Sequence, residues 1–303
     1  MLQNYELRAQ ARKALQNNWQ IALLVGLIAM LPSIISQVVA TLTGGNLATR
    51  MMETISSGNV QMLTSDQALA SYLQGLLRDS GYQATALVSV LAWLIAPVLS
   101  LGFTAYLLGL VRMNAGGVAA VFSRAKVWYK AIGLNLLVSI KVFLWGLPGA
   151  VLTFGGIFLA TSRATLSNWN AVLNGISILY SLGLAAMTVP MVLAALRYAM
   201  ATTVLADAPE TGVFACVKRS KELMQNRKGA YFTLMLSFIG WALLLSITQV
   251  LLMSLVGYVI ASTVYMVLNL ALQVYMNATS CEFYLQVKGE EPIIVLDAPN
   301  QEN

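Results

Sequence analysis

The chain has 303 residues, of which 58% are hydrophobic and only 10% are charged, and its mean hydropathy is +0.72. A soluble domain carries roughly 25% charged residues, so this composition excludes an ordinary soluble protein. The 18 Lys and Arg residues outnumber the 12 Asp and Glu residues, but their placement follows a membrane topology, and we expect no nucleic-acid partner. The chain contains no histidine, the commonest metal ligand and general base, so we expect neither a metal nor a cofactor.

Long charge-free stretches predict the architecture. They are 14–49, 80–111, 142–162, 164–196 and 229–281. About 20 apolar residues of helix cross a bilayer, so most of these stretches can span once and the last can span twice. The sequence therefore predicts an all-α, polytopic membrane helix bundle with about six transmembrane helices. Their expected ranges are 20–42, 84–111, 131–160, 170–196, 230–256 and 259–285.

The basic residues between these spans predict a topology. Of the 18 Lys and Arg residues, 14 fall on the side of the two termini, and Lys141 lies inside the third span. The other side receives only Arg50, Arg78 and Arg163. Short basic loops remain in the cytoplasm. We therefore expect a multi-pass protein of the plasma membrane with both termini in the cytoplasm.

We expect a single integral membrane domain, 1–303, with four segments outside its spans. Residues 1–19 form an amphipathic lead, 207–228 an amphipathic helix and 289–303 a tail, all on the cytoplasmic side. Residues 43–83 form the outer loop, which carries a short helix. That helix is either an interfacial spacer or a lid over a substrate site.

Three basic amphipathic segments each lead directly into a span, which suggests an internal repeat. They cover 8–24, 119–137 and 217–236. Repeats of this kind are common in membrane proteins, and a two-plus-two-plus-two plan of helices would follow. The alternative is that any protein with an even number of spans alternates basic loops with apolar helices.

The segment before the fifth span carries dense local signals. Asp207 can cap a helix whose first turn contains Pro209, and Glu210 stands at the spacing of a capping box. One face of the predicted helix is apolar and the other is basic. The basic face offers a surface for anionic lipid headgroups or for a membrane-protein partner, and each cation is worth about 1 kcal/mol near such lipid. The residues of this candidate surface are Lys218, Arg219, Lys221, Arg227 and Lys228.

Polar residues within the spans form a candidate polar core. Four of them recur every four residues on one face of the sixth span: Tyr265, Asn269, Gln273 and Asn277. Amides that face lipid would be unsatisfied, so this polar ladder either bonds a neighbouring helix or lines a polar path. Lys141 is the one charge deep in a span, where it costs roughly 2.5–3.5 kcal/mol without a partner. Its candidate partners are Glu282 and the amides of the sixth helix.

The segment 197–244 also resembles a known family. Its motifs are Arg-Tyr-x-Met-Ala at 197–201, Ala-Asp-x-Pro at 206–209 and Ser-Lys-Glu-Leu-Met at 220–224. These motifs are similar to those of the bacterial integral membrane family called domain of unknown function 975. The family-motif residues are Arg197, Tyr198, Asp207, Pro209, Ser220 and Met224. The resemblance implies a bacterial plasma-membrane fold, similar in plan to the membrane portion of some glycerophosphodiester phosphodiesterases, and it implies no reaction.

These observations favour a protein that is not an enzyme, because motifs for phosphate binding, nucleophilic catalysis and zinc binding are missing from the sequence. We expect an accessory or envelope-maintenance module that engages lipid, a protein partner or a second copy of itself. The alternative is a small-solute or lipid transporter with a polar path along the sixth helix, and a lipid-modifying enzyme is the third hypothesis. A continuous polar cleft from Lys141 to Asn269 and Gln273 would favour transport, whereas a dry bundle would favour the accessory role.

Overall fold

The computed structural model describes residues 4–43, 70–71, 74–75, 78–114, 116–162 and 169–290. Within these ranges the chain contains helices and no strand, so the predicted all-α fold is confirmed. The first elements are α1 (Asn4–Leu15), α2 (Trp19–Leu42), α5 (Ser80–Val111), η2 (Val118–Phe122), η3 (Ala125–Val127) and α6 (Trp128–Ser162). The remaining elements are α7 (Trp169–Tyr198), α8 (Ala201–Asp207), α9 (Val213–Leu223), α10 (Lys228–Leu236), α11 (Ile239–Val256) and α12 (Tyr258–Lys288).

Five helical segments of the described chain are long and apolar enough to cross a membrane. They are Trp19–Leu42, Ser80–Val111, Val118–Leu159, Ile178–Asp207 and Lys228–Val256. The 31-residue helix α12 corresponds to the sixth predicted span but is not among the five, and its last two turns carry Glu282 and Lys288. The membrane-type helix bundle is thus confirmed, while the sixth span stays a prediction.

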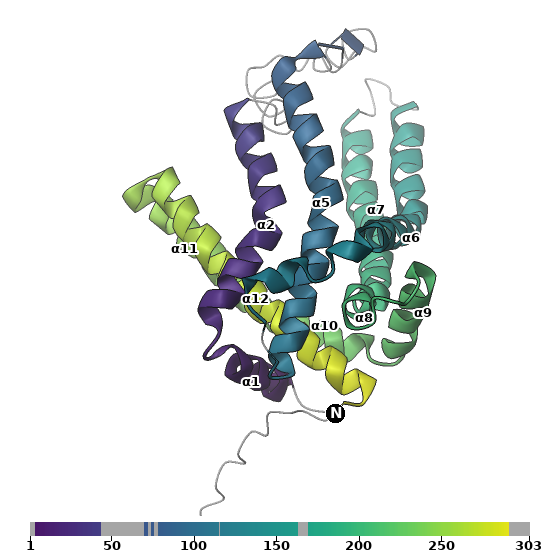
Figure 1. Cartoon of the computed structure of the whole chain (residues 1–303). Helices are drawn as coiled ribbons and strands as arrows, with labels where there is room; N and C mark the ends of the chain where they lie inside the picture. Colours follow the sequence, from purple (N-terminus) through teal and green to yellow (C-terminus); the bar gives the residue numbers. More distant parts are fainter. Residues whose placement is uncertain are drawn as a thin grey trace, which may run out of the picture.

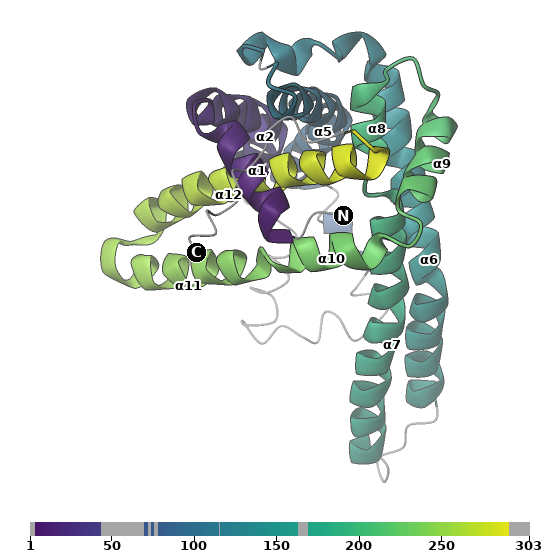
Figure 2. The same ribbon diagram turned by 90° about the horizontal axis from the view of Figure 1, so that it is seen from below.

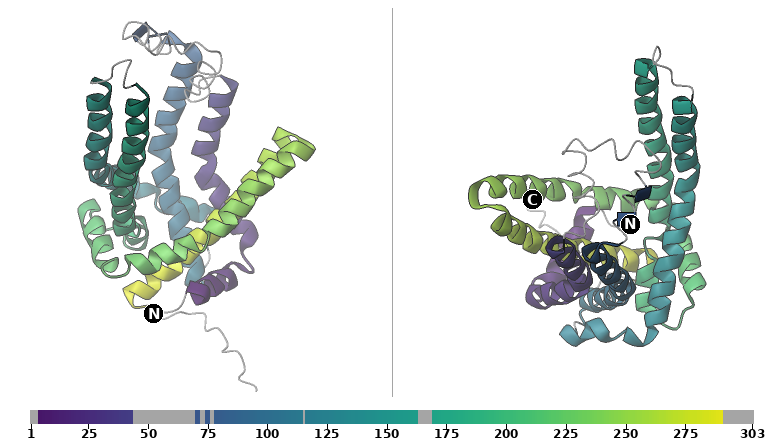
Figure 3. Two further views of the ribbon diagram at one scale, coloured as in Figure 1. Left: turned by 180° about the vertical axis from the view of Figure 1, so that it is seen from behind. Right: turned by 90° about the horizontal axis from the view of Figure 1, so that it is seen from above.

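In the described part of the chain the long helices form three antiparallel pairs, α2 with α5, α6 with α7, and α11 with α12 (Figure 1). The pairs meet at one end of the molecule, where α1, α8, α9 and α10 also lie, and we call this end the base. Figures 2 and 3 show the pairs diverging from the base in different directions. Each pair follows a short helical segment, α1, η2–η3 or α9, which agrees with a two-plus-two-plus-two plan of helices.

Small residues bring α6 and α7 close together. Gly149 lies against the backbone of Ala186 and Met187, where a Cβ atom would overlap both, and Gly183 lies against Thr153. The Thr153 hydroxyl donates to the Gly149 carbonyl at 2.7 Å, so its polar group is satisfied within its own helix. Close contact through small residues is the usual way in which helices pack inside a membrane.

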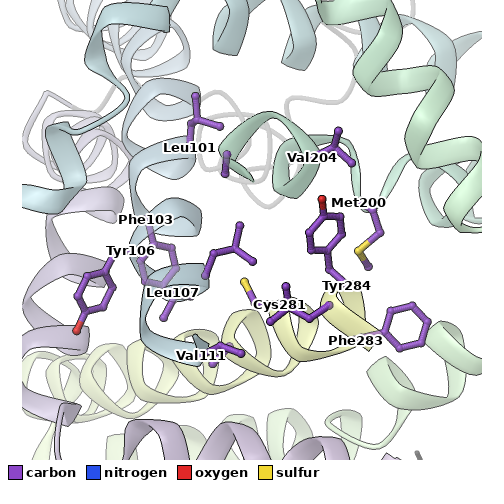
Figure 4. Close-up of a cluster of buried hydrophobic side chains, with 14 of the residues drawn as sticks. Leu101, Phe103, Tyr106, Leu107, Val111, Met200, Val204, Cys281, Phe283 and Tyr284 are labelled. Atoms are coloured by element: carbon purple, nitrogen blue, oxygen red, sulfur yellow. The ribbon is translucent and has the colours of Figure 1, made fainter. Parts of the chain in front are cut away.

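The hydrophobic core is concentrated at the base, between α5, α8 and α12 (Figure 4). Tyr106 on α5, Met200 before α8 and Phe283 on α12 are almost fully buried there. Away from the base the helices expose large apolar side chains, including Leu87 on α5 at 68% and Phe158 on α6 at 71%. Extensive exposed apolar surface marks a region that contacts lipid or protein. The base therefore holds the three pairs together, and their outer parts present an apolar surface.

The cytoplasmic helix predicted for 207–228 is shorter in the structure. Helix α9 covers Val213–Leu223 and has Gly212 as its N-cap. Asp207 is instead the last residue of α8, so the prediction that Asp207 caps this helix in a capping box was wrong. The physical reason is tertiary, because side chains from α5 and α12 bind the Asp207 carboxylate.

For the four other predicted segments, the comparison with the structure gives different outcomes. Helix α1 (Asn4–Leu15) lies within the lead expected at 1–19. The fifth span, expected as one helix, is interrupted at Ser237 and Phe238 between α10 and α11. Most of the outer loop 43–83, with its predicted short helix, and nearly all of the tail 289–303 lie outside the described residues.

Candidate functional site

A cluster of five polar side chains joins three helices at the base. We call it the charged junction, and its members are Arg112, Asp207, Tyr284, Lys288 and Glu290. Arg112 directly follows α5, Asp207 ends α8, and the other three come from the end of α12 and the turn after it. Figure 4 shows the Tyr284 ring extending from α12 towards α8. The junction therefore fixes the relative positions of α5, α8 and α12.

Asp207 is the centre of the charged junction, and its side chain is only 10% exposed. Its Oδ1 accepts from Arg112 Nη1 at 2.7 Å. Its Oδ2 accepts from Lys288 Nζ at 2.7 Å and from Tyr284 Oη at 2.9 Å. A buried carboxylate is tolerated when its partners replace the water it has lost, and here both oxygens are bound.

Glu290 closes the junction on its solvent side. Arg112 donates to it from Nε and Nη2 at 3.1 and 3.0 Å, and Lys288 Nζ donates at 2.6 Å. Burial raises the pKa of Glu290, but the hydrogen bonds from Lys288 and Arg112 outweigh this effect, and the pKa lies below its ordinary value. The hydrogen bond to Asp207 raises the pKa of Arg112, and burial offsets only part of that rise. Glu290 and Arg112 are therefore held in their ionised forms.

Two cavities flank the charged junction and share Asp207. One, of about 450 Å³, is lined by Arg112, Asn114 and Arg124 among others. The other, of about 470 Å³, extends to Lys218 on α9. Because each charge of the junction is already paired, the cluster is suited to clamping helices together, and it presents no free carboxylate for proton transfer.

The family-motif residues of this segment lie at the base and connect α9 to its neighbours. The Ser220 hydroxyl donates to the Arg197 carbonyl at 3.1 Å, which ties α9 to the end of α7. The Arg197 guanidinium lies 5.2 Å from the centre of the Trp145 ring on α6, within the range of a cation–π contact. Tyr198 packs against the core, and Met224 is fully buried. Their roles in the structure are contacts between helices.

Pro209, the remaining motif residue, takes part through its backbone. Lys130, at the start of α6, donates to the Pro209 carbonyl at 2.7 Å and to the Glu210 carbonyl at 3.1 Å. The turn between α8 and α9 is thereby attached to α6. The motif Ala-Asp-x-Pro thus supplies one carboxylate and one carbonyl to basic partners from different helices.

The candidate lipid or partner surface is smaller than the sequence predicted. Lys218, Arg219 and Lys221 are exposed on α9, although Arg219 forms an ion pair with Glu222 at 3.5 Å. Arg227 is half-buried and donates to the Val287 carbonyl at 3.1 Å, so it links α10 to α12. Lys228 is also half-buried, as the first residue of α10. Three cations therefore form the exposed basic surface.

The polar ladder of α12 bonds mainly within its own helix. Asn269 Nδ2 donates to Tyr265 Oη at 3.4 Å, and Asn277 Nδ2 donates to the Gln273 carbonyl at 2.7 Å. All four side chains are partly buried. The hydrogen bonds satisfy part of the ladder without a substrate and without a second helix.

The structure does not bring Lys141 to this ladder. Lys141 lies on α6, which packs chiefly against α7, whereas α12 packs against α11, α1, α5 and α2. Across the described ranges Lys141 has neither a hydrogen bond nor an ion pair, and its side chain is partly buried. Glu282, its other candidate partner, is 5% exposed near the end of α12 at the base. The members of the predicted polar core are therefore divided between two helix pairs.

Sequence reasoning missed the charged junction as a unit. The sequence marks Arg112 and Lys288 only as basic residues near span ends, and Tyr284 lies four residues before Lys288. That spacing puts Tyr284 and Lys288 on one helical face, which is a signal for a shared partner. It does not identify Asp207 as that partner, because the two segments are 77 residues apart.

Comparisons with known proteins give one match. A family model with the description "Protein of unknown function (DUF975)" matches residues 1–291. The match includes every described helix from α1 to α12, so the family resemblance seen in the motifs is confirmed. Neither a search of curated proteins nor a search of solved structures found a match. The likeness to phosphodiesterase membrane portions stays a prediction.

Proposed function

The chain belongs to this family of unknown function, and we propose that it is a non-enzymatic accessory module of the bacterial plasma membrane. Its base lies in the cytoplasmic headgroup layer and docks on anionic lipid through α9. Envelope maintenance is the role that such a module would serve. The observation that carries the proposal is that α9 has one buried face and one exposed basic face.

Helix α9 has one buried face and one basic face. Cys216, Val217 and Leu223 are buried against the base, so the helix is anchored in one orientation. That orientation leaves Lys218 and Lys221 exposed. A helix of this kind lies in the plane of a membrane surface, where its cations attract anionic headgroups.

The distribution of basic residues supports a cytoplasmic base. The base carries α1, η2–η3, α9 and the end of α12, and these segments contain nine of the 18 Lys and Arg residues of the chain. Basic loops remain on the cytoplasmic side, where anionic lipid is abundant. Transport receives less support, since Lys141 and the polar ladder belong to different helix pairs.

The test measures the protection of α9 in the full-length protein. Hydrogen exchange of residues 213–223 is compared in nanodiscs of phosphatidylglycerol and of phosphatidylcholine. We expect greater protection in phosphatidylglycerol, and we expect the variant Lys218→Gln/Arg219→Gln/Lys221→Gln to lose that difference. Each lost cation should weaken the binding of α9 to the anionic lipid about fivefold, because one cation contributes roughly 1 kcal/mol.

The matched control exchanges the same residues without changing their charge, as Lys218→Arg/Arg219→Lys/Lys221→Arg. It should retain the protection by phosphatidylglycerol, because the attraction depends on charge number. Equal protection of the wild-type helix in both lipids would contradict docking on anionic lipid. Protection that persists in the neutral variant would indicate that α9 docks on protein.

A further inference from the structure

A second, separate feature of the base is a cavity of about 630 Å³ between α1, α11 and α12. Helix α1 contributes Tyr5, Arg8, Ala9 and Arg12 to its wall. These positions are spaced i, i+3, i+4 and i+7, so they form one continuous face of the helix. The opposite face of α1, which includes Leu7 and Ala11, is buried in the core, and the arginine face is therefore directed into the cavity.

The rest of the cavity wall is apolar. Leu268, Ala271 and Leu272 of α12 lie on one face of that helix, and Trp241 and Leu245 of α11 lie opposite. Several of these side chains are well exposed, with Trp241 at 56% and Leu268 at 42%. The cavity is thus basic on the side of α1 and apolar towards the outer ends of α11 and α12.

Within the part of the chain that the structure describes, the side chains of both arginines have no partner. Nε of Arg8 is buried, and none of the described residues accepts a hydrogen bond from it. Across the same residues, neither Arg8 nor Arg12 forms an ion pair, and no carboxylate lines the cavity. Tyr5 donates to Glu6 at 3.2 Å, outside the cavity wall. A buried guanidinium nitrogen without an acceptor is costly. The terminal nitrogens of Arg8 are not buried in this way, so they are available in the cavity to an external acceptor group.

A hydrogen bond from a side chain of α12 to the backbone of α1 keeps the arginine face in place. Tyr275 Oη, which lines the cavity, donates to the Arg8 carbonyl at 3.1 Å. The Tyr275 ring in turn lies edge-on to Phe238, with ring centroids 5.3 Å apart, and Phe238 is fully buried. The cavity is therefore built on side chains that are fixed by the core, although its mouth is open.

We propose that this cavity binds one anionic glycerophospholipid, with the phosphate held by Arg8 and Arg12 and the acyl chains lying against α11 and α12. Arginine binds phosphate oxygens through two parallel hydrogen bonds, and the arginines one turn apart can hold a single phosphate from both sides. Trp19 and Trp241 line the same cavity, and tryptophan favours the level of the lipid headgroups. The proposal rests on the placement of the base in the headgroup layer, but it does not depend on the α9 surface.

The shape of the site distinguishes a lipid from a soluble phosphate compound. A free phosphate would leave the apolar wall formed by Leu245, Leu268 and Leu272 exposed to water, whereas acyl chains would cover it. Covering apolar surface contributes about 25 cal/mol per Å². A lipid would place its phosphate on the arginine face and would also cover the apolar wall with its acyl chains.

The experiment titrates the purified full-length protein in mild detergent with phosphatidylglycerol and counts bound lipids by native mass spectrometry. We expect the wild type to retain one phosphatidylglycerol more tightly than phosphatidylcholine. The variant Arg8→Gln/Arg12→Gln should weaken that binding by about thirtyfold, since two cations are removed. The variant Ala271→Trp fills the apolar side without changing charge, and it should weaken binding as well.

The control variant Lys218→Gln/Arg219→Gln removes two cations from α9 and should leave this tight binding unchanged. The experiment therefore distinguishes a failure of lipid docking at α9 from a failure of lipid binding in this cavity. Equal retention of phosphatidylcholine would overturn the proposal, as would full retention in both cavity variants. Competition by glycerol phosphate as effective as that by phosphatidylglycerol would also overturn it, because the site would then recognise only the headgroup.

Discussion

Asp207 is a single residue that connects several helices of the base. Its carboxylate is bound by Arg112, Lys288 and Tyr284, which belong to two other helices. Removing one member of a buried ion cluster leaves the remaining charges without compensation, and this typically costs about 3–5 kcal/mol. Exposed ion pairs contribute about 0–1 kcal/mol. The energetic importance of the base charges is therefore set by burial and by the number of bonds.

The first prediction at this scale concerns Asp207→Asn. We expect it to lower the stability of the protein in detergent by about 3 kcal/mol or more, because Arg112 and Lys288 lose the charge between them. The matched control is Glu222→Gln, which breaks the exposed pair with Arg219 and should cost at most about 1 kcal/mol. Thermal unfolding of both variants gives the comparison, and equal melting temperatures would contradict a structural role for the junction.

The error at Asp207 also shows what local sequence cannot reveal. Asp207, Pro209 and Glu210 satisfy the local pattern of a helix start. In the structure the carboxylate instead binds side chains from α5 and α12, and the following helix begins at Val213. Capping contributes about 1 kcal/mol, and three bonds to charged and polar partners outweigh it. Only knowledge of the tertiary arrangement could have decided between these two uses of the residue.

At the scale of elements, the long helices were predictable because a helix that crosses lipid must be apolar over about 20 residues. The first span was expected at 20–42 and is Trp19–Leu42, and the second was expected at 84–111 and is Ser80–Val111. Charge-free runs end where the membrane ends, so their boundaries are encoded locally.

The break between α10 and α11 was not predictable in this way. The turn at Ser237 and Phe238 contains neither Gly nor Pro. Phe238 is fully buried and packs against Tyr275 of α12, and the Ser237 hydroxyl donates to the Leu234 carbonyl at 2.6 Å. A tertiary contact thus accompanies the break between α10 and α11, whereas the local sequence predicts one continuous helix.

The second prediction tests how α6 and α7 pack. Gly149→Leu should push the two helices apart, because even a Cβ atom overlaps the backbone of Ala186 and Met187, and overpacking costs about 1–3 kcal/mol or more. Gly155→Leu lies on the same helix, where an added Cβ meets no atom within 4 Å, and it should leave stability within about 0.5 kcal/mol. Thermal unfolding in one detergent compares the two, and similar losses would show that the effect is not one of helix contact.

At the scale of the whole molecule, the base and the helix pairs have different surroundings. Helix α5 has 32 residues and is about 48 Å long at 1.5 Å per residue, whereas the hydrocarbon core of a bilayer is about 30 Å thick. One end of α5 must therefore extend beyond the hydrocarbon. The end at Arg112 carries the charged junction, which supports the proposal that the base projects into the headgroup layer.

The last prediction concerns the side on which the base projects. Ser123, which follows η2, and Gln225, which follows α9, are both exposed at the base, whereas Ser57 belongs to the loop between α2 and α5, outside the described residues. In a background with Cys216 and Cys281 replaced, a membrane-impermeant maleimide added to intact cells should label a cysteine at Ser57. It should label cysteines at Ser123 and Gln225 only after lysis, because the basic loops of the base remain in the cytoplasm. Labelling of Ser123 in intact cells would reverse the orientation, and the anionic lipid of the cytoplasmic leaflet could then no longer be the surface that α9 meets.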